Sequence, residues 1–195
     1  MRLFKPELIP PLPEETPKWP SAQTEIDLEI GAGAGLHAIR YCQSNPDRFL
    51  IAIERTTKAD RLFSRARNHP KIQNLLPVRA DALHWAAKNI PENSLSRVFI
   101  LYPNPYPKAS QKNLRWVHMP FMGFLKSRLN ARGELILATN SPEYANDSQK
   151  SLKNDWNFSH VTVVQLPEDS VPRTHFEKKY LARREPCFEV RANLN

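Results

Sequence analysis

The chain has few of the residues that mark disulfide-rich and zinc-binding proteins. Only two of its 195 residues are cysteines, Cys42 and Cys187, and no CxxC spacing occurs. The sequence therefore has neither a zinc signature nor a disulfide framework, and reduced thiols in a cytoplasmic protein are expected. The six histidines show no metal-ligand spacing, so no metal site is expected.

Long apolar segments are also missing. No apolar run approaches the roughly 20 residues that cross a membrane. The N-terminal Met-Arg-Leu-Phe-Lys-Pro is not followed by the apolar region of a signal peptide. The sequence thus predicts no membrane association, and it leaves the oligomeric state open.

Acidic residues are outnumbered by basic ones. The 28 Lys and Arg residues exceed the 20 Asp and Glu residues, which gives a net charge of +8. Such an excess favours a polyanionic partner such as nucleic acid, although a merely basic surface explains it equally well. The cations of residues 57–68 fit a solvated helix face. Better candidates for phosphate contacts lie near the C-terminus: Lys178, Lys179, Arg183 and Arg184.

Prolines concentrate at the start of the chain. Residues 1–20 hold six of the eighteen prolines, so this segment cannot be a helix or a central strand and is expected to form an extended arm. The remaining residues, 21–195, are long enough for one domain with its own core.

Apolar segments alternate with helix-like segments after the arm. Strands are predicted at residues 26–30, 49–54, 75–79, 98–102, 134–139, 161–166 and 187–191. Helices are predicted at residues 36–43, 57–68, 83–89, 112–128 and 142–155. This alternation predicts an α/β fold with a seven-stranded, mostly parallel sheet covered on both faces. The last two strands, with no helix predicted between them, indicate an antiparallel finish.

Glycine is scarce, but three of the five glycines lie together directly after the strand at 26–30. Gly31, Gly33 and Gly35 let the backbone pass close to a ligand, and the helix behind them offers free N–H groups. A nucleotide-like cofactor is therefore expected. The spacing is G-x-G-x-G rather than the dinucleotide pattern G-x-G-x-x-G, which disfavours an NAD-dependent oxidoreductase.

Three acids accompany the ends of the first three predicted strands. Glu29 precedes the first glycine and could hold a positively charged group. Glu54 could accept hydrogen bonds from ribose hydroxyls, and Asp81 could reach an adenine amino group. Carboxylates around the site repel a pyrophosphate but suit S-adenosylmethionine, which carries a sulfonium, an ammonium and a ribose. Each feature alone is also typical of a tight turn or a solvated acid; their order favours this cofactor.

Four further segments resemble motifs of the tRNA (guanine-N(7)-)-methyltransferase family. Leu101–Lys108 is similar to Phe-Pro-Asp-Pro-Trp-Pro-Lys, Thr139–Tyr144 to Thr-Asp-x-x-x-Tyr, and Arg173–Glu177 to Thr-x-Phe-Glu. Asn93–Arg97, which leads into the fourth strand, also resembles the family. The motifs follow the family's order over roughly residues 25–192. The resemblance implies a Rossmann-like class I fold, one S-adenosylmethionine-dependent domain at 21–195, and tRNA as the partner.

The resemblance also implies a role at each matching position. Asn104 stands at the active-site position after the fourth strand. The substrate positions are Lys108, Asn140, Thr174 and Glu177. The cofactor positions are Glu29, Gly31, Gly33, Gly35, Glu54, Asp81 and Ala82.

The chain departs from the family pattern on the substrate side. Asn104 and Asn140 replace aspartates, Tyr106 replaces tryptophan, and the neutral Ala-Ser-Gln at 109–111 replaces a basic Lys-Arg-His run. Two other readings therefore stay open. Asn104-Pro-Tyr106 is similar to the Asn-Pro-Pro-Tyr motif of enzymes that methylate an adenine amino group or a glutamine amide. The chain could also be a non-catalytic relative that binds RNA or the cofactor.

Overall fold

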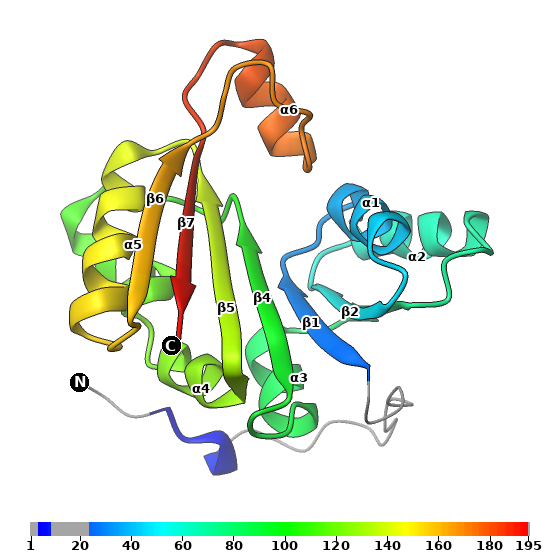
Figure 1. Ribbon diagram of the computed structural model, residues 1–195, viewed down its shortest axis with the longest axis horizontal. Coiled ribbons are helices and arrows are strands. Elements are labelled where there is room, and N and C mark those ends of the chain that lie inside the picture. The colour runs from blue at the N-terminus through cyan, green and yellow to red at the C-terminus, as the bar shows by residue number, and fades with distance from the viewer. Residues whose placement is uncertain (1–3, 9–23, 195) are drawn as a thin grey trace.

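The computed structural model of the chain describes residues 4–8 and 24–194 (Figure 1). The strands are β1 (Glu25–Ile30), β2 (Arg48–Glu54), β3 (Leu75–Arg79), β4 (Leu95–Leu101), β5 (Leu129–Thr139), β6 (His160–Gln165) and β7 (Phe188–Asn193). The α-helices are α1 (Leu36–Ser44), α2 (Ala59–Asn68), α3 (Ala82–Asn89), α4 (Phe121–Arg128), α5 (Pro142–Asn154) and α6 (His175–Ala182). Short 3-10 helices are η1 (Pro6–Leu8), η2 (Ala109–Leu114) and η3 (Trp116–His118).

The strands form one sheet in the order β3-β2-β1-β4-β5-β7-β6. Strands β1 to β5 pair in parallel, whereas β7 runs antiparallel to both β5 and β6. The predicted seven-stranded, mostly parallel sheet with an antiparallel last strand is therefore confirmed.

Helices cover both faces of the sheet (Figure 1). Side chains alternate along a strand, so Leu28 and Ile30 of β1 face one layer while Asp27 and Glu29 face the other. Leu28 and Ile30 belong to the larger core, which contains buried residues of α3, α4 and α5. A smaller core packs α1 and α2 against the opposite face of β2. None of the helices in the described residues is long and apolar enough to cross a membrane.

The parallel strands place the functional segments at one edge of the sheet. The carboxyl ends of β1, β2, β4 and β5 meet there, which is where ligands bind in open α/β sheets. The glycine turn follows β1 and the Leu101–Lys108 loop begins at the end of β4. Helix α6 lies beyond the same edge (Figure 1).

The predicted helix at 112–128 is wrong. The segment forms η2, η3 and α4 instead, because the chain becomes extended at Arg115 (ψ 137°) and again at Met119 (ψ 139°). Met119 precedes Pro120, and a residue before proline is driven out of the helical region. Only the portion after Pro120 is α-helical.

The prediction that no helix lies between the last two strands is also wrong, because α6 lies between β6 and β7. In the N-terminal arm, Pro6–Leu8 forms the single 3-10 turn η1, contrary to the expectation of no helix. Pro6 is the first residue of that turn, where its missing N–H costs nothing. Phe4 packs edge-on against Phe121 at 5.0 Å between ring centroids, so this end of the arm contacts α4. Residues 9–20 of the arm lie outside the described residues.

Candidate functional site

The glycine turn after β1 has the left-handed backbone that its sequence predicts. Gly31, Gly33 and Gly35 have φ values of 78°, 56° and 77°. An added Cβ at Gly31 or Gly33 would meet nothing within 4 Å, whereas at Gly35 it would lie 2.5 Å from Cδ1 of Leu62. The first two glycines therefore border open space, and the third allows α2 to pack closely.

A cleft of about 340 Å³ lies beside this turn. Five of the residues predicted from the sequence line it: Glu29, Gly31, Gly33, Thr174 and Lys179. Leu101, the last residue of β4, lines it too. The structure thus joins the turn after β1, the end of β4 and the start of α6 around one space.

Glu29 forms the acidic floor of the cleft. Glu29 is only 2% exposed, and its Oε2 lies 3.1 Å from Nδ1 of His37. Neither atom has a hydrogen-bond partner of good geometry in the described part of the chain. The His37 ring packs near Phe99, at 4.9 Å between centroids. The site therefore holds a buried carboxyl oxygen that can accept a hydrogen bond from a positively charged group.

Glu54 supports the turn from the end of β2. Its carboxylate accepts hydrogen bonds from the Gly33 N–H (2.9 Å), the Thr56 N–H (2.8 Å) and the Thr56 hydroxyl (2.6 Å). Burial alone would raise the pKa of Glu54, but these bonds outweigh it and hold the pKa below its usual value. Glu54 is not among the residues that line the cleft.

Asp81 caps α3. Its Oδ1 accepts hydrogen bonds from the N–H groups of Leu83 (3.0 Å) and His84 (3.4 Å), and its Oδ2 lies 3.6 Å from Arg55. Ala82 is the first residue of that helix and is buried. Neither residue lines the cleft, and their contact with a cofactor stays a prediction.

The loop after β4 carries Asn104 on its surface. Asn104 is exposed, and its Oδ1 accepts a hydrogen bond from the Tyr106 N–H at 3.3 Å. Two residues of the segment have left-handed backbones, Tyr102 (φ 52°) and Tyr106 (φ 43°). Lys108 is exposed and precedes η2. Neither Asn104 nor Lys108 lines the cleft.

Arg115 holds this loop, and sequence reasoning missed it. It donates to the carbonyl oxygens of Pro105 (2.9 Å) and Tyr106 (3.1 Å). Its guanidinium, 3% exposed, also pairs with Asp147 (2.8 Å) and Glu143 (2.9 Å) of α5. Its partners are distant in sequence, so no local pattern indicated this role.

Asp147 is the centre of this charge cluster. Burial alone would raise the pKa of Asp147, but hydrogen bonds from Arg115, His118 and Lys112 outweigh it and lower the pKa. Asp147 therefore stays ionised and fixes Arg115 against the loop.

Glu177 anchors α6 from inside the protein. It is 1% exposed, and its Oε1 accepts hydrogen bonds from the Tyr102 hydroxyl (2.7 Å) and from Nη2 of Arg173 (2.8 Å). Thr174 caps the helix, because its hydroxyl accepts from the Glu177 N–H at 3.0 Å. Asn140 donates to Oε2 of Glu185 at 3.2 Å. These contacts tie α6 and the segment after it to the ends of β4 and β5.

Apart from Lys179, which was predicted as a phosphate contact, the remaining charged and aromatic lining residues were not assigned to the site from the sequence. His37, His175 and Phe176 received no role, and the cations of α2 were interpreted as a solvated face. The structure instead places Lys58, Arg61 and Arg65 at the cleft, together with Lys179 from α6.

Comparison with known proteins decides the family. A family model described as "Putative methyltransferase" matches residues 23–190. The tRNA (guanine-N(7)-)-methyltransferase of Chlorobium phaeobacteroides is 30% identical over 163 residues, which cover 84% of this chain and 78% of that protein. The chain belongs to this methyltransferase family. It is a divergent member, since Asn104 and Asn140 stand at positions where the family resemblance predicts aspartates.

Two further comparisons agree with this assignment. The bifunctional methyltransferase of Rickettsia bellii is 30% identical over 155 residues; these cover 80% of this chain but only 27% of that longer protein. The solved structure of the 16S rRNA methyltransferase KamB matches with a TM-score of 0.65 at 14% identity, covering 88% of this chain and 89% of that one. This likeness confirms the Rossmann-like methyltransferase fold.

Proposed function

We propose that this family member transfers a methyl group from S-adenosylmethionine to guanine nitrogen 7 in tRNA. The observation that supports the cofactor best is Glu29, a buried carboxylate at the floor of a cleft beside Gly31. Its buried Oε2 lies near His37 but has no hydrogen-bond partner of good geometry, which is costly, so a positively charged ligand is the expected occupant of that position.

The residues present fit this cofactor. Glu29 would hold its ammonium group, and the open space at Gly31 and Gly33 leaves room for it beside the backbone. Glu54 and Asp81, at the ends of β2 and β3, would serve its ribose and adenine. The cofactor supplies the methyl group on a sulfonium, which is a good leaving group.

The protein's own contribution is then alignment. Nitrogen 7 of guanine has a free lone pair and needs no general base, so the catalytic gain comes from holding the base in line. The loop that carries Asn104 is held in place for this task by Arg115, which donates hydrogen bonds to two of its carbonyl oxygens. Asn104 offers one acceptor oxygen and an amide donor to the edge of the base.

Single-turnover transfer of a labelled methyl group to bulk tRNA tests the proposal. Wild-type protein is expected to label the RNA. Glu29→Gln should bind the cofactor weakly and lose most of the transfer, because the carboxylate charge is gone. Glu168→Gln removes an equal charge at an exposed position outside the cleft and should transfer normally.

The same assay separates the alternatives. A protein that binds S-adenosylmethionine and tRNA without any transfer would be a non-catalytic relative. Transfer to an adenine amino group or a glutamine amide would instead support the likeness of Asn104-Pro-Tyr106 to enzymes that act on planar nitrogens.

A further inference from the structure

Four cationic side chains line the cleft that holds Glu29. Lys58 directly precedes α2, Arg61 and Arg65 belong to α2, and Lys179 comes from α6 on the other side. We call these four residues the cleft cations. Lys58, Arg61 and Arg65 are spaced by three and four residues, so they share one face of the helix. Lys58 lies 5.6 Å from the ring centroid of Phe176, which brings the two helices together.

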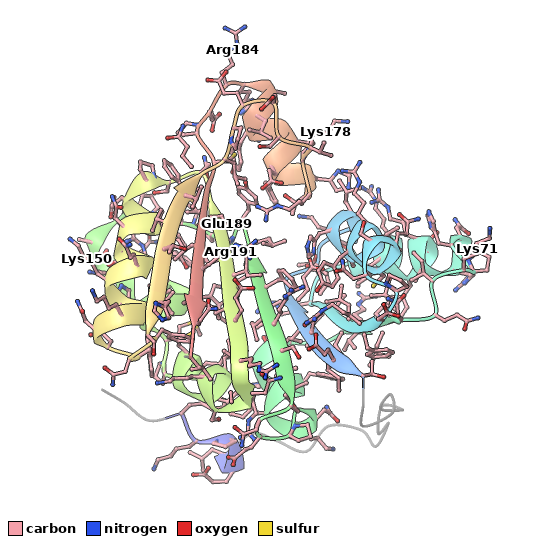
Figure 2. All side chains as sticks on the ribbon, viewed as in Figure 1. Lys71, Lys150, Lys178, Arg184, Glu189 and Arg191 are labelled. Carbon is pink, nitrogen blue, oxygen red and sulfur yellow. The ribbon has the colours of Figure 1, made fainter. Side chains whose placement is uncertain are left out.

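In the part of the chain that the structure describes, the cleft cations form no ion pair with a carboxylate, unlike arginines in the strands of the sheet. Arg48 pairs with Asp27 at 2.5 Å, and Arg191 pairs with Glu189 at 2.6 Å on β7 (Figure 2). Within residues 4–8 and 24–194, no carboxylate lies within 4.0 Å of a cleft cation nitrogen. Like charges that face one space repel each other. Four cations beside one space raise its positive potential, which favours the entry of an anion.

The positive potential extends beyond the cleft itself. Burial and the nearby charges of Arg65, Lys178 and Arg61 lower the pKa of His175 at the start of α6. Figure 2 shows Lys178 on the side of α6 toward α1 and α2, whereas Arg184 points away from the molecule. The cations that face the cleft thus continue outward along α6.

The opposite side of the site offers little positive charge. Residues 109–111 of η2 are neutral, and Lys112 is paired with Asp147 at 3.0 Å. The single carboxylate of S-adenosylmethionine needs one cation, so the cleft cations exceed what the cofactor can neutralise. A ligand with several phosphates matches the excess.

We propose that the cleft cations bind the phosphate backbone of the RNA substrate, which would cross the cleft between α2 and α6 on its way to the Asn104 loop. This inference rests on the proposed function for its choice of RNA. It also turns the α2 face from a solvated surface into a binding surface.

A matched pair of double variants tests this. Arg61→Gln with Arg65→Gln removes two cleft cations. Arg67→Gln with Lys71→Gln removes the same charge from exposed positions that do not line the cleft; Lys71 lies beyond the C-terminal end of α2 (Figure 2). Binding of a fluorescent tRNA transcript is measured at several salt concentrations.

The first double variant should bind tRNA about tenfold more weakly near physiological salt and lower the slope of log affinity against log salt by about 2. The second should bind within about twofold of wild type with an unchanged slope. Equal losses in both variants would mean that only net charge matters, and no loss in the first would mean that RNA avoids this face; either result overturns the proposal. Should the first variant misfold, Lys179→Gln alone should lower the slope by about 1.

Two more arms separate this inference from the proposed function. Calorimetric affinity for S-adenosylhomocysteine should stay close to that of wild type in the first double variant, because Lys58 and Lys179 remain to pair with its single carboxylate. Tight tRNA binding with the expected slope but no methyl transfer would contradict the proposed function alone. Normal transfer with an unaltered slope would contradict this inference alone.

Inorganic pyrophosphate tests whether a small anion occupies the cleft instead. If pyrophosphate stabilises the wild-type protein while the salt slope of tRNA binding does not change in the first double variant, the cleft cations bind a free phosphate ligand, and the RNA proposal is overturned.

Discussion

The hydroxyl of Tyr102 donates a 2.7 Å hydrogen bond to Oε1 of Glu177, which joins the residue after β4 to α6. Both side chains are buried, and the Tyr102 backbone is left-handed. The same carboxylate accepts hydrogen bonds from the backbone and the guanidinium of Arg173. One buried acid therefore sets the position of the helix that closes the cleft.

This arrangement predicts how stability depends on pH. Burial alone would raise the pKa of Glu177, but Arg173 and Tyr102 outweigh it and hold the pKa below the ordinary 4.5. A carboxylate with a lowered folded-state pKa stabilises the protein above its unfolded pKa, and that stability is lost as the pH falls toward the folded value. Glu177→Gln should therefore be less stable than wild type at neutral pH and lose less stability below about pH 4.5.

Urea unfolding across this pH range measures the effect. Glu92→Gln provides the control, because Glu92 is exposed and its ion pair with Arg128 is long, at 3.5 Å. If the free energy of unfolding falls as steeply with decreasing pH in Glu177→Gln as in the control, Glu177 does not carry this stability.

Arg115 holds the loop that carries Asn104, so its removal should measurably lower the free energy of unfolding. Arg115→Met should lower the free energy of unfolding by about 3 kcal/mol, since it leaves Asp147, whose side chain is only 13% exposed, with fewer partners. Lys112 also contacts Asp147 but is half exposed, so Lys112→Met should cost less than about 1 kcal/mol. Similar losses for the two variants would contradict the assigned role of Arg115.

Alanine substitutions at Gly31 and Gly35 of the turn should differ in their effects on stability and on cofactor affinity. Gly31→Ala should cost about 1 kcal/mol, because the left-handed backbone disfavours a Cβ that otherwise meets open space. Gly35→Ala should cost about 1–3 kcal/mol more, because its Cβ overlaps Leu62. Cofactor affinity should fall more in Gly31→Ala, whose methyl group enters the cleft. Normal affinity for S-adenosylhomocysteine in that variant, measured by calorimetry, would place the cofactor elsewhere.

Asn104 gives a test of substrate recognition. A charge-assisted hydrogen bond is roughly twice as strong as a neutral one, so a carboxylate should hold the guanine N–H donors more firmly. Asn104→Asp should raise kcat/KM for tRNA methylation about fivefold, equivalent to about 1 kcal/mol. Asn113→Asp adds the same charge at an exposed position of η2 and should not raise it. An unchanged rate in Asn104→Asp would deny the residue a role in recognition.

The central strands and the glycine turn were predictable because local patterns determine them. Apolar runs such as 26–30 and 49–54 are buried strands, and Gly31, Gly33 and Gly35 need the left-handed region. Helix α6 was also present as a local signal that was missed. Thr174-His-Phe-Glu177 fits the capping box, and Thr174 accepts the hydrogen bond typical of that motif.

The remaining site contacts depend on packing between distant segments. Arg115 meets Glu143 and Asp147 only because η2 and η3 lie beside α5. Arg61 and Arg65 face a cleft because α6, far along the chain, lies opposite them. Glu54 was predicted from its place after β2, yet its bond to the Gly33 N–H required the folded turn. The sequence identifies such residues as polar but does not pair them.

The most direct test of the account is the identity of the methylated nucleoside. Unmodified tRNA transcripts are incubated with the protein and S-adenosylmethionine, digested, and analysed by mass spectrometry. The account predicts 7-methylguanosine that disappears with Glu29→Gln. A different methylated nucleoside, or none despite saturable cofactor binding, would contradict it.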